Sequence, residues 1–212
     1  MRRAVVFLLV GLCILCGCVG EKRPPTDAEI DQFFAAAENG NLETLKNLLS
    51  KRAKWELLRA RDREGMDATP LHWAASSGHT DIAEFLISEG ADLTAMSAYG
   101  ETPLHWAARE RRFKVAELLI AKGADVNARN NMRETPMHWS AQKGDAATTR
   151  LLLANGADPN AKDQDGWGVL DWALASAEST QEVVAILRQC GAKATLDNPP
   201  RDYAPSPPPI PP

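Results

Sequence analysis

The stretch Thr69-Pro70-Leu71-His72-Trp73-Ala74-Ala75 occurs three times in this chain with small changes. It returns as TPLHWAA at 102–108 and as TPMHWSA at 135–141, each copy 33 residues after the one before, and a divergent copy, GVLDWA, stands at 168–173. A period of this length is typical of proteins in which one small structural unit is stacked several times. Because such a stack buries its apolar side chains between neighbouring units, the chain is predicted to form one elongated domain.

The motif start T-P-L-H-x-A, together with the 33-residue period, resembles the ankyrin-repeat family. The resemblance covers roughly Ala28 to Ala194. It implies an all-α solenoid in which each repeat holds a β-turn and an antiparallel helix pair, with about five repeats including caps. We place the domain at 28–197 and its repeats at about 28–63, 64–96, 97–129, 130–162 and 163–197. The resemblance also implies a module that binds another protein.

Residues that favour helix starts and stops fall at fixed places in the period. Thr26-Asp27-Ala28-Glu29 has the pattern of a capping box, so a helix is predicted to begin there. In the later repeats a threonine should open the first helix, and the proline after it suits the first helical turn. Glycine should close the second helix in the left-handed conformation. These threonines are Thr69, Thr102 and Thr135, and the glycines are Gly90, Gly123 and Gly156.

The two ends of the array depart from the pattern. The segment Arg52 to Ala68 holds five extra residues, which we predict to form a loop lying back on the first repeat; the alternative is a loop that binds a partner. In the last repeat, Gly168 and Val169 replace Thr-Pro and Asp171 replaces histidine. Divergent end units are expected because they must shield the stack from water.

The first twenty residues have the pattern of an export signal. Arg2 and Arg3 precede an apolar run from Ala4 to Leu15 that is too short to span a bilayer comfortably. The ending Leu15-Cys16-Gly17-Cys18 is similar to a bacterial lipoprotein box, although Cys16 is unusual at its position. The resemblance implies a signal peptide at 1–17, cleavage before Cys18, lipidation of Cys18, and a tether at 18–27. The alternatives are an ordinary secretory signal or an uncleaved anchor.

The charge of the chain bears on its possible partners, and its cysteine content on possible disulfides. Of 24 Lys and Arg residues, Arg2 and Arg3 lie in the segment expected to be removed, which leaves 22 basic residues against 28 acidic ones. An acidic chain is a poor match for nucleic acid, which requires a basic face. Only Cys190 lies in the repeats, so a disulfide framework is excluded there. We expect Cys190 to pack as a small apolar residue.

The histidines and tryptophans of the motif recur at equivalent positions. His72, His105 and His138 should lie on successive helices about 8–10 Å apart, too far to share a metal ion. The resemblance implies a structural role for them, and we predict no catalytic residue, metal site or cofactor. The tryptophans at 73, 106, 139 and 172 are expected to be buried; the alternative is partial exposure as a recognition stripe.

Partner contacts in this family occur at the turn tips and at the start of the loop after the first helix. By register the predicted partner-binding residues are Tyr99, Glu101, Arg109, Glu110, Met132, Glu134, Gln142, Lys143 and Trp167. Among them, Tyr99, Met132 and Trp167 would form an apolar strip bordered by charges, as interface cores are bordered by polar rims. Each could instead be ordinary solvated surface.

The last fifteen residues, 198–212, contain eight prolines, which predicts a Pro-rich tail of extended polyproline II conformation. We read it as an inert spacer; a PxxP-type ligand is the alternative. Taken together, the sequence predicts a monomeric, lipid-anchored ankyrin-repeat protein that faces the periplasm, with the outer membrane favoured, and binds an unidentified protein through its concave face. The alternative function is an accessory or inhibitor, of the immunity type, of a periplasmic enzyme or toxin.

Overall fold

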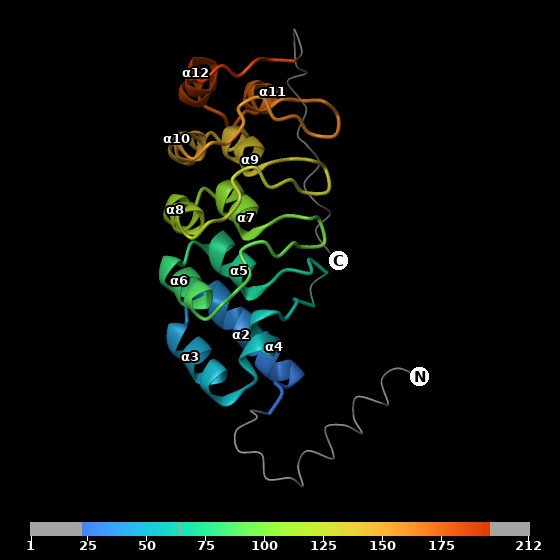
Figure 1. Cartoon of the computed structure of the whole chain (residues 1–212), viewed down its shortest axis with the longest axis vertical. Helices are drawn as coiled ribbons and strands as arrows, with labels where there is room; N and C mark the ends of the chain where they lie inside the picture. Colours follow the sequence, from blue (N-terminus) through green and yellow to red (C-terminus); the bar gives the residue numbers. More distant parts are fainter. Residues whose placement is uncertain (1–22, 64, 196–212) are drawn as a thin grey trace, which may run out of the picture.

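The computed structural model describes residues 23–63 and 65–195. These residues form a stack of helices with no β-strand among them, which confirms the predicted all-α solenoid (Figure 1). The predicted signal peptide, Cys18 and the Pro-rich tail lie outside the described residues. The helices are α2 (Asp27–Asn39), α3 (Leu42–Lys51), α4 (Lys54–Leu58), α5 (Pro70–Ser77), α6 (Thr80–Ser88), α7 (Pro103–Arg109), α8 (Phe113–Ala121), α9 (Pro136–Gln142), α10 (Ala146–Ala154), α11 (Val169–Ala175) and α12 (Gln181–Gln189).

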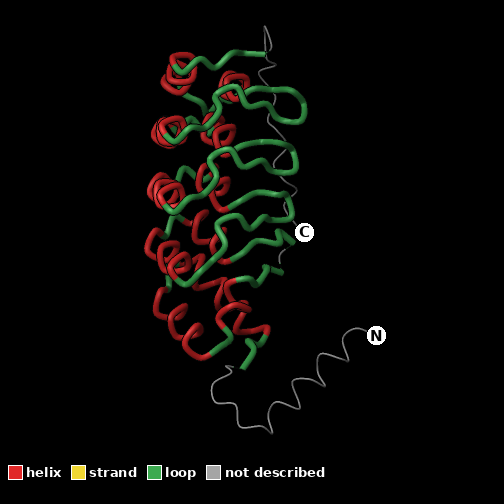
Figure 2. Tube along the Cα trace, in the orientation of Figure 1, coloured by secondary structure: helices red, strands yellow, loops and turns green. Residues whose placement is uncertain are grey.

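The helices form two columns, and the long loops project from one side of the stack (Figure 2). The inner column holds α2, α5, α7, α9 and α11, each packed against the next, and the outer column holds α3, α6, α8, α10 and α12. Each inner helix also packs against the outer helix of its own repeat. Neighbouring repeats are therefore joined along the whole inner column, and along the outer column from α6 to α12.

The inner helices begin where the sequence predicts. Thr69, Thr102 and Thr135 are the N-cap residues of α5, α7 and α9, and a proline follows each. In each repeat the histidine Nδ1 accepts the threonine backbone N–H at 3.1 Å, which closes a reciprocal capping box. In the last repeat an Asp171 Oδ2 atom accepts the Gly168 N–H at 2.8 Å instead. Asp171 thus performs the capping role of the histidine that it replaces.

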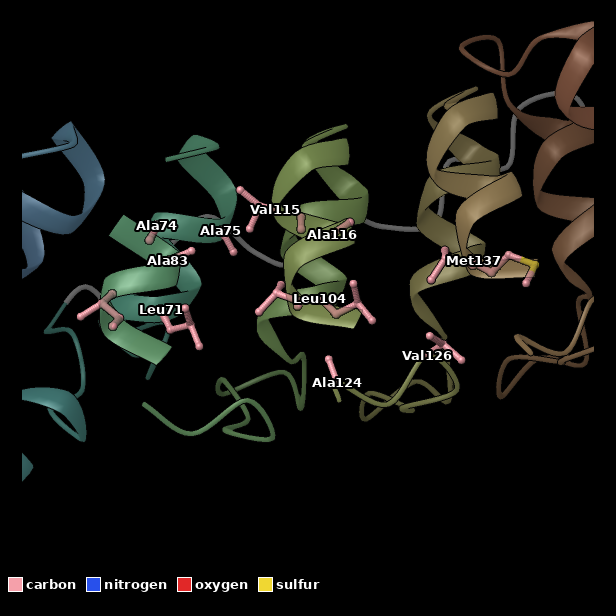
Figure 3. Packing of buried hydrophobic residues seen from close by; sticks show 14 of the residues in the cluster. Leu71, Ala74, Ala75, Ala83, Leu104, Val115, Ala116, Ala124, Val126 and Met137 are labelled. Atoms are coloured by element: carbon pink, nitrogen blue, oxygen red, sulfur yellow. The ribbon is translucent and has the colours of Figure 1, made fainter. Parts of the chain in front are cut away.

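The core is one continuous layer between the two helix columns. Leu71, Leu104 and Met137 occupy equivalent positions on α5, α7 and α9, and each is fully buried (Figure 3). Alanines such as Ala74 and Ala116 lie beside them and let the helices approach closely. The glycines that follow α6, α8 and α10 have φ of 98°, 95° and 85°, so the second helices end in the predicted left-handed residue.

Two local predictions were wrong. Part of the segment 52–68 forms the short helix α4, where a loop was expected; α4 packs against α3 of the first repeat, as predicted for the segment, with Leu57 and Leu58 buried and Trp55 59% exposed. Cys190 is exposed because it is the C-cap residue of α12, beyond the last buried leucine, Leu187. No described helix has the length and apolar content needed to cross a membrane.

Candidate concave binding face

The loops before the inner helices are narrow hairpins, which we call fingers: residues 95–101, 128–134 and 161–167, and a longer first finger of which residues 59–63 and 65–68 are described. Three of them close with the same backbone hydrogen bond, between the first and fifth residue of the turn; an example is Asn130 N–H to the Glu134 carbonyl at 3.0 Å. The first residue of each turn also accepts backbone N–H groups through its side chain. Asn130 Oδ1, for instance, accepts the N–H of Met132 and of Glu134 at 3.0 and 2.9 Å.

The fingers are also joined to one another by backbone hydrogen bonds. Ala98 N–H donates to the Met66 carbonyl at 2.8 Å, Asn131 N–H to the Tyr99 carbonyl at 2.9 Å, and Gln164 N–H to the Met132 carbonyl at 2.8 Å. Met66, Tyr99 and Met132 therefore occupy one position on three successive fingers. Met132 is 45% exposed, and the other two are half-buried. This row, Met66–Tyr99–Met132, is the apolar strip of the finger tips.

The predicted strip contained Trp167 and lacked Met66. Trp167 lies two residues further along its finger, in the register of Glu101 and Glu134, and packs against the buried cluster of Trp139 and Trp172. Met66 stands 33 residues before Tyr99, so the period also marks its position; the prediction missed it because it began the strip one repeat later, at Tyr99. The strip thus runs toward the N-terminal end of the stack, where the prediction ran it toward the C-terminal end.

Behind the fingers, the four motif tryptophans form a row along the inner helices, which we call the indole row. Trp73 and Trp106 meet edge to face with ring centroids 5.5 Å apart, and Trp139 and Trp172 do the same at 5.5 Å. Trp106, Trp139 and Trp172 are 2%, 6% and 2% exposed, whereas Trp73 is half-buried. The expected burial is found for three of the four rings.

Carboxylates of the fingers hold the indole N–H groups. Trp73 Nε1 donates to Asp62, Trp106 Nε1 to Glu101 and Trp172 Nε1 to Asp163, at 2.7 to 3.0 Å. The buried Nε1 of Trp139 has no hydrogen-bond partner within residues 23–63 and 65–195. Its counterpart in register, Glu134, instead accepts from Asn130 Nδ2 at 2.6 Å.

Arg109 joins the two tryptophan pairs. Its guanidinium lies 5.2 Å from the ring centroid of Trp106 and 5.6 Å from that of Trp139, a cation–π arrangement on both sides. Its Nη1 also lies 3.0 and 3.1 Å from the two Glu101 carboxylate oxygens. Arg109 and Glu101 were predicted to face a partner, but both are engaged inside the protein, with side chains 15% and 2% exposed.

Glu134 is likewise buried, where a surface residue was expected. Burial raises the pKa of its carboxyl, the nearby acidic groups Glu101 and Asp163 also raise it, and Asn130 and Arg109 lower it; the resulting pKa is about 7. Register placed Glu101 and Glu134 on the fingers correctly. It did not show that their side chains turn back toward the indole row.

The remaining predicted residues lie at the ends of the inner helices. Glu110 follows α7 and is exposed, while Gln142 and Lys143 at the end of α9 are half-buried. Lys143 pairs with the exposed Glu178 of the next repeat at 3.1 Å, and the Gln142 carbonyl accepts the Ser176 hydroxyl at 2.7 Å. These residues border the same face as the finger tips.

The three motif histidines are buried and hydrogen-bonded. His72 Nε2 lies 2.9 Å from the Glu101 carbonyl, and His105 Nε2 lies 3.1 Å from the Glu134 carbonyl. Desolvation lowers the pKa of His72, His105 and His138 to about 4, so each ring is neutral at pH 7. The rings of His72 and His105 therefore each tie an inner helix to the finger of the next repeat, whereas the buried Nε2 of His138 has no hydrogen-bond partner among residues 23–63 and 65–195. Across the described part of the chain, no group of three or more His, Cys, Asp or Glu side chains could hold a metal ion.

Comparison with known proteins gives matches in the repeats. A family model described as "Ankyrin repeats (3 copies)" matches residues 33–130 and 127–198. The human "Ankyrin repeat domain-containing protein 49" is 45% identical over 62 residues, which are 29% of this chain and 24% of that protein. A "Putative ankyrin repeat protein" of Rickettsia bellii is 40% identical over 72 residues, 33% of this chain and 42% of that protein.

An enzyme also matches, but over little of its length. "Palmitoyltransferase akr1" of Schizosaccharomyces pombe is 39% identical over 64 residues, which are 30% of this chain and only 9% of that protein. The chain thus covers less than half of each of these relatives. The likeness concerns the repeats, and none of the relatives' whole-protein activities follows from it.

Proposed function

The chain belongs to the ankyrin-repeat family, and we propose that it binds another protein through its concave face, the surface formed by the fingers and the inner helices. Ankyrin repeats imply protein–protein interaction and typically serve as binding scaffolds without catalytic activity. The observation that carries the proposal is the strip Met66–Tyr99–Met132, which the backbone bonds between fingers hold in line. A preorganised surface loses little entropy on binding, so it favours association.

The composition of the face supports a protein partner. Met132 is the most exposed apolar side chain of the strip, and the polar residues Asn131 and Arg133 flank it at the fingertip. Apolar contacts within a polar border are the usual arrangement of protein interfaces. Glu110, Gln142 and Lys143 extend the border along the helix ends.

Crosslinking and pull-down from cell-envelope fractions tests this function. A Tyr99→Ala/Met132→Ala double variant should lose the crosslinked partner that the wild type captures. The matched control is Glu84→Ala/Glu117→Ala, which changes two exposed residues on the outer helices α6 and α8. Equal capture by the finger variant, or equal loss in the control, would contradict binding through the concave face. If the captured protein is an enzyme whose turnover changes on mixing, the accessory or inhibitor function is favoured.

We also propose that the protein is a lipoprotein anchored through Cys18, with the repeats facing the periplasm. The support is the lipoprotein-box pattern Leu15-Cys16-Gly17-Cys18 after a short apolar run. Several acyl chains on one cysteine would give stable anchoring, which one chain alone does not. Globomycin treatment or Cys18→Ala should leave the precursor unprocessed or release the protein from the membrane fraction. Unchanged processing and membrane recovery would overturn the anchoring proposal.

A further inference from the structure

A pocket of about 340 Å³ lies at the N-terminal end of the concave face, between α2 and the first finger. Its apolar lining comes from Phe34, Ala35 and Trp73. Carboxylates of Asp31, Glu38 and Asp62 line the rest, together with Arg63. It therefore combines two aromatic rings with an excess of negative charge.

The pocket exists because the indole row ends one repeat before the helix stack does. Both α2 and α5 end at a left-handed glycine, Gly40 and Gly78. Aligning these two glycines places Ala35 at the position of Trp73 on the next helix. The place that another indole would fill thus holds a methyl group. This explains why Trp73 is half-buried while the other three tryptophans of the row are buried.

The interior of the row shows how this protein holds a cation between such rings. Arg109 lies over Trp106, and the same carboxylate, Glu101, binds both the guanidinium and the Trp106 indole N–H. At the open end, Asp62 Oδ2 accepts the Trp73 indole N–H at 3.0 Å. The other oxygen, Oδ1, is buried, and no described residue hydrogen-bonds to it. The indole and carboxylate of the Arg109 arrangement are thus present, but no described arginine makes a cation–π contact with Trp73, and the nearby Arg63 pairs with Asp27 instead.

The charges at the pocket favour a cationic occupant. Arg63 pairs with Asp27 and lies 3.9 Å from Asp31, so it offsets the charge of these two residues. Glu38 and Asp62 form no ion pair with any Lys or Arg in the described part of the chain. The Glu38 backbone carbonyl lies 2.9 Å from His79 Nε2, which fixes this end of α2 against the following repeat.

We propose that the pocket binds the guanidinium group of an arginine side chain presented by the protein partner, stacked on the open side of Trp73, paired with the exposed Glu38 and attracted by the unneutralised charge of Asp62. Arginine fits better than lysine because its planar fork both stacks on an indole and bonds to carboxylates. The inference rests on the proposed function in one respect: the arginine is supplied by the protein partner. The pocket itself can be tested without the partner.

The test uses N-acetyl-arginine amide as the probe, with N-acetyl-lysine amide and the neutral isostere N-acetyl-citrulline amide as comparisons. The measurement is the NMR signal of the Trp73 indole N–H in the repeat protein, assigned by its loss in Trp73→Phe. Arginine amide should shift this signal in a saturable way, lysine amide more weakly, and citrulline amide not at all. An equal shift with citrulline, or no shift with arginine, would overturn the proposal.

Two variants and a control locate the binding. Ala35→Trp should fill the pocket with an indole and abolish the shift. Because this variant could disturb α2, the second variant is Glu38→Gln, which changes an exposed residue. It should bind arginine amide about tenfold more weakly, because one charge-assisted hydrogen bond is lost. Glu117→Gln on the outer helix α8 should bind arginine amide as the wild type does. Unchanged affinity for arginine amide in both Glu38→Gln and Ala35→Trp would place the binding elsewhere and contradict the proposed site.

Partner capture separates this inference from the proposed function. If arginine amide fails to bind but the partner is still captured through the finger tips, the pocket inference fails and the proposed function stands. If Ala35→Trp abolishes arginine binding but leaves partner capture unchanged, the pocket does not serve the partner and that part of the inference is overturned.

Discussion

Arg109 and Glu101 form an ion pair within the concave face, with Arg109 Nη1 3.0 and 3.1 Å from the two carboxylate oxygens. The Glu101 side chain is almost fully buried, and both partners also contact the Trp106 indole. A pair in this position holds the finger to the inner helix. It also leaves Glu101 dependent on Arg109 for the neutralisation of its charge.

Replacing Arg109 with methionine should therefore destabilise the domain strongly. The variant keeps much of the side-chain volume but leaves a buried carboxylate without its cation, a change that typically costs roughly 3–5 kcal/mol. Urea unfolding at pH 7 measures the loss. The control is Arg150→Ala, which breaks the exposed Arg150–Glu182 pair and should cost less than about 1 kcal/mol. Similar losses of unfolding free energy in the two variants would show that the Arg109–Glu101 pair contributes no more than an exposed ion pair.

Glu134 should give the stability of the protein a specific pH dependence. Its folded-state pKa is about 7, above the value of about 4.3 expected in the unfolded chain. Between these values the folded state holds a proton that the unfolded chain has released. The stability that protonated Glu134 contributes is therefore lost as the pH rises from about 4.3 through 7.

The measurement is the unfolding free energy of wild type and Glu134→Gln from pH 5 to 8. Relative to wild type, the variant should become more stable as the pH rises, because glutamine does not ionise. The buried histidines have the opposite effect on the pH dependence. The stability that their neutral rings contribute is lost as the pH falls below about 6.5. Their contribution is common to both proteins and cancels in the difference. A difference that does not change with pH would refute the role given to Glu134.

His105→Ala should weaken the fold, although the residue lies on the concave side of the stack. The ring accepts the Thr102 N–H and contacts the Glu134 carbonyl, so its removal leaves buried groups unpaired, a loss of about 1–3 kcal/mol. Met132→Ala should stay within about 0.5 kcal/mol, because that residue lies at the surface and is 45% exposed. Thermal unfolding of the two variants checks the comparison. The reverse order would mean that the division between fold and surface is wrong.

Gly100→Ala should disrupt the contact between two fingers. Gly100 has φ of 74°, and an added Cβ would lie 2.8 Å from the Asn131 backbone nitrogen, which donates to Tyr99. Gly156 has φ of 85° and nothing within 4 Å of the same atom. Alanine at either site costs about 1–2 kcal/mol for its left-handed backbone. Only Gly100→Ala should lose more stability than this, and it should also speed hydrogen exchange of the Asn131 amide. Equal losses of stability in the two variants, with unchanged exchange, would argue against a tight contact between the fingers.

The 33-residue period predicted the helices well because their start and stop signals are local. Thr69, Thr102 and Thr135 carry their own capping partners three residues later, so no distant contact is needed to place α5, α7 and α9. The period also identified equivalent positions on the fingers. It could not give the direction of a side chain, which is why Glu101 and Glu134 were expected at the surface.

One signal in the sequence pointed to the buried arrangement. Glu101 stands five residues before Trp106, and Arg109 three residues after it, which places an acid and a base on either side of one indole. The pocket beside Trp73 was harder to foresee. Its position depends on aligning Ala35 with Trp73, and that alignment requires the ends of α2 and α5, which the insertion conceals.

The geometry of the indole row has an optical consequence. Its two pairs have nearly the same arrangement, with ring centroids 5.5 Å apart in both and interplanar angles of 82° and 79°. Chromophores this close share their electronic excitation, so the two pairs should add couplets of the same sign to the circular dichroism of the folded chain. Excitation should also pass readily between the rings of a pair. A ligand that quenches Trp73 would then also reduce the fluorescence of Trp106. The two rings would respond to binding beside Trp73 as a single fluorophore.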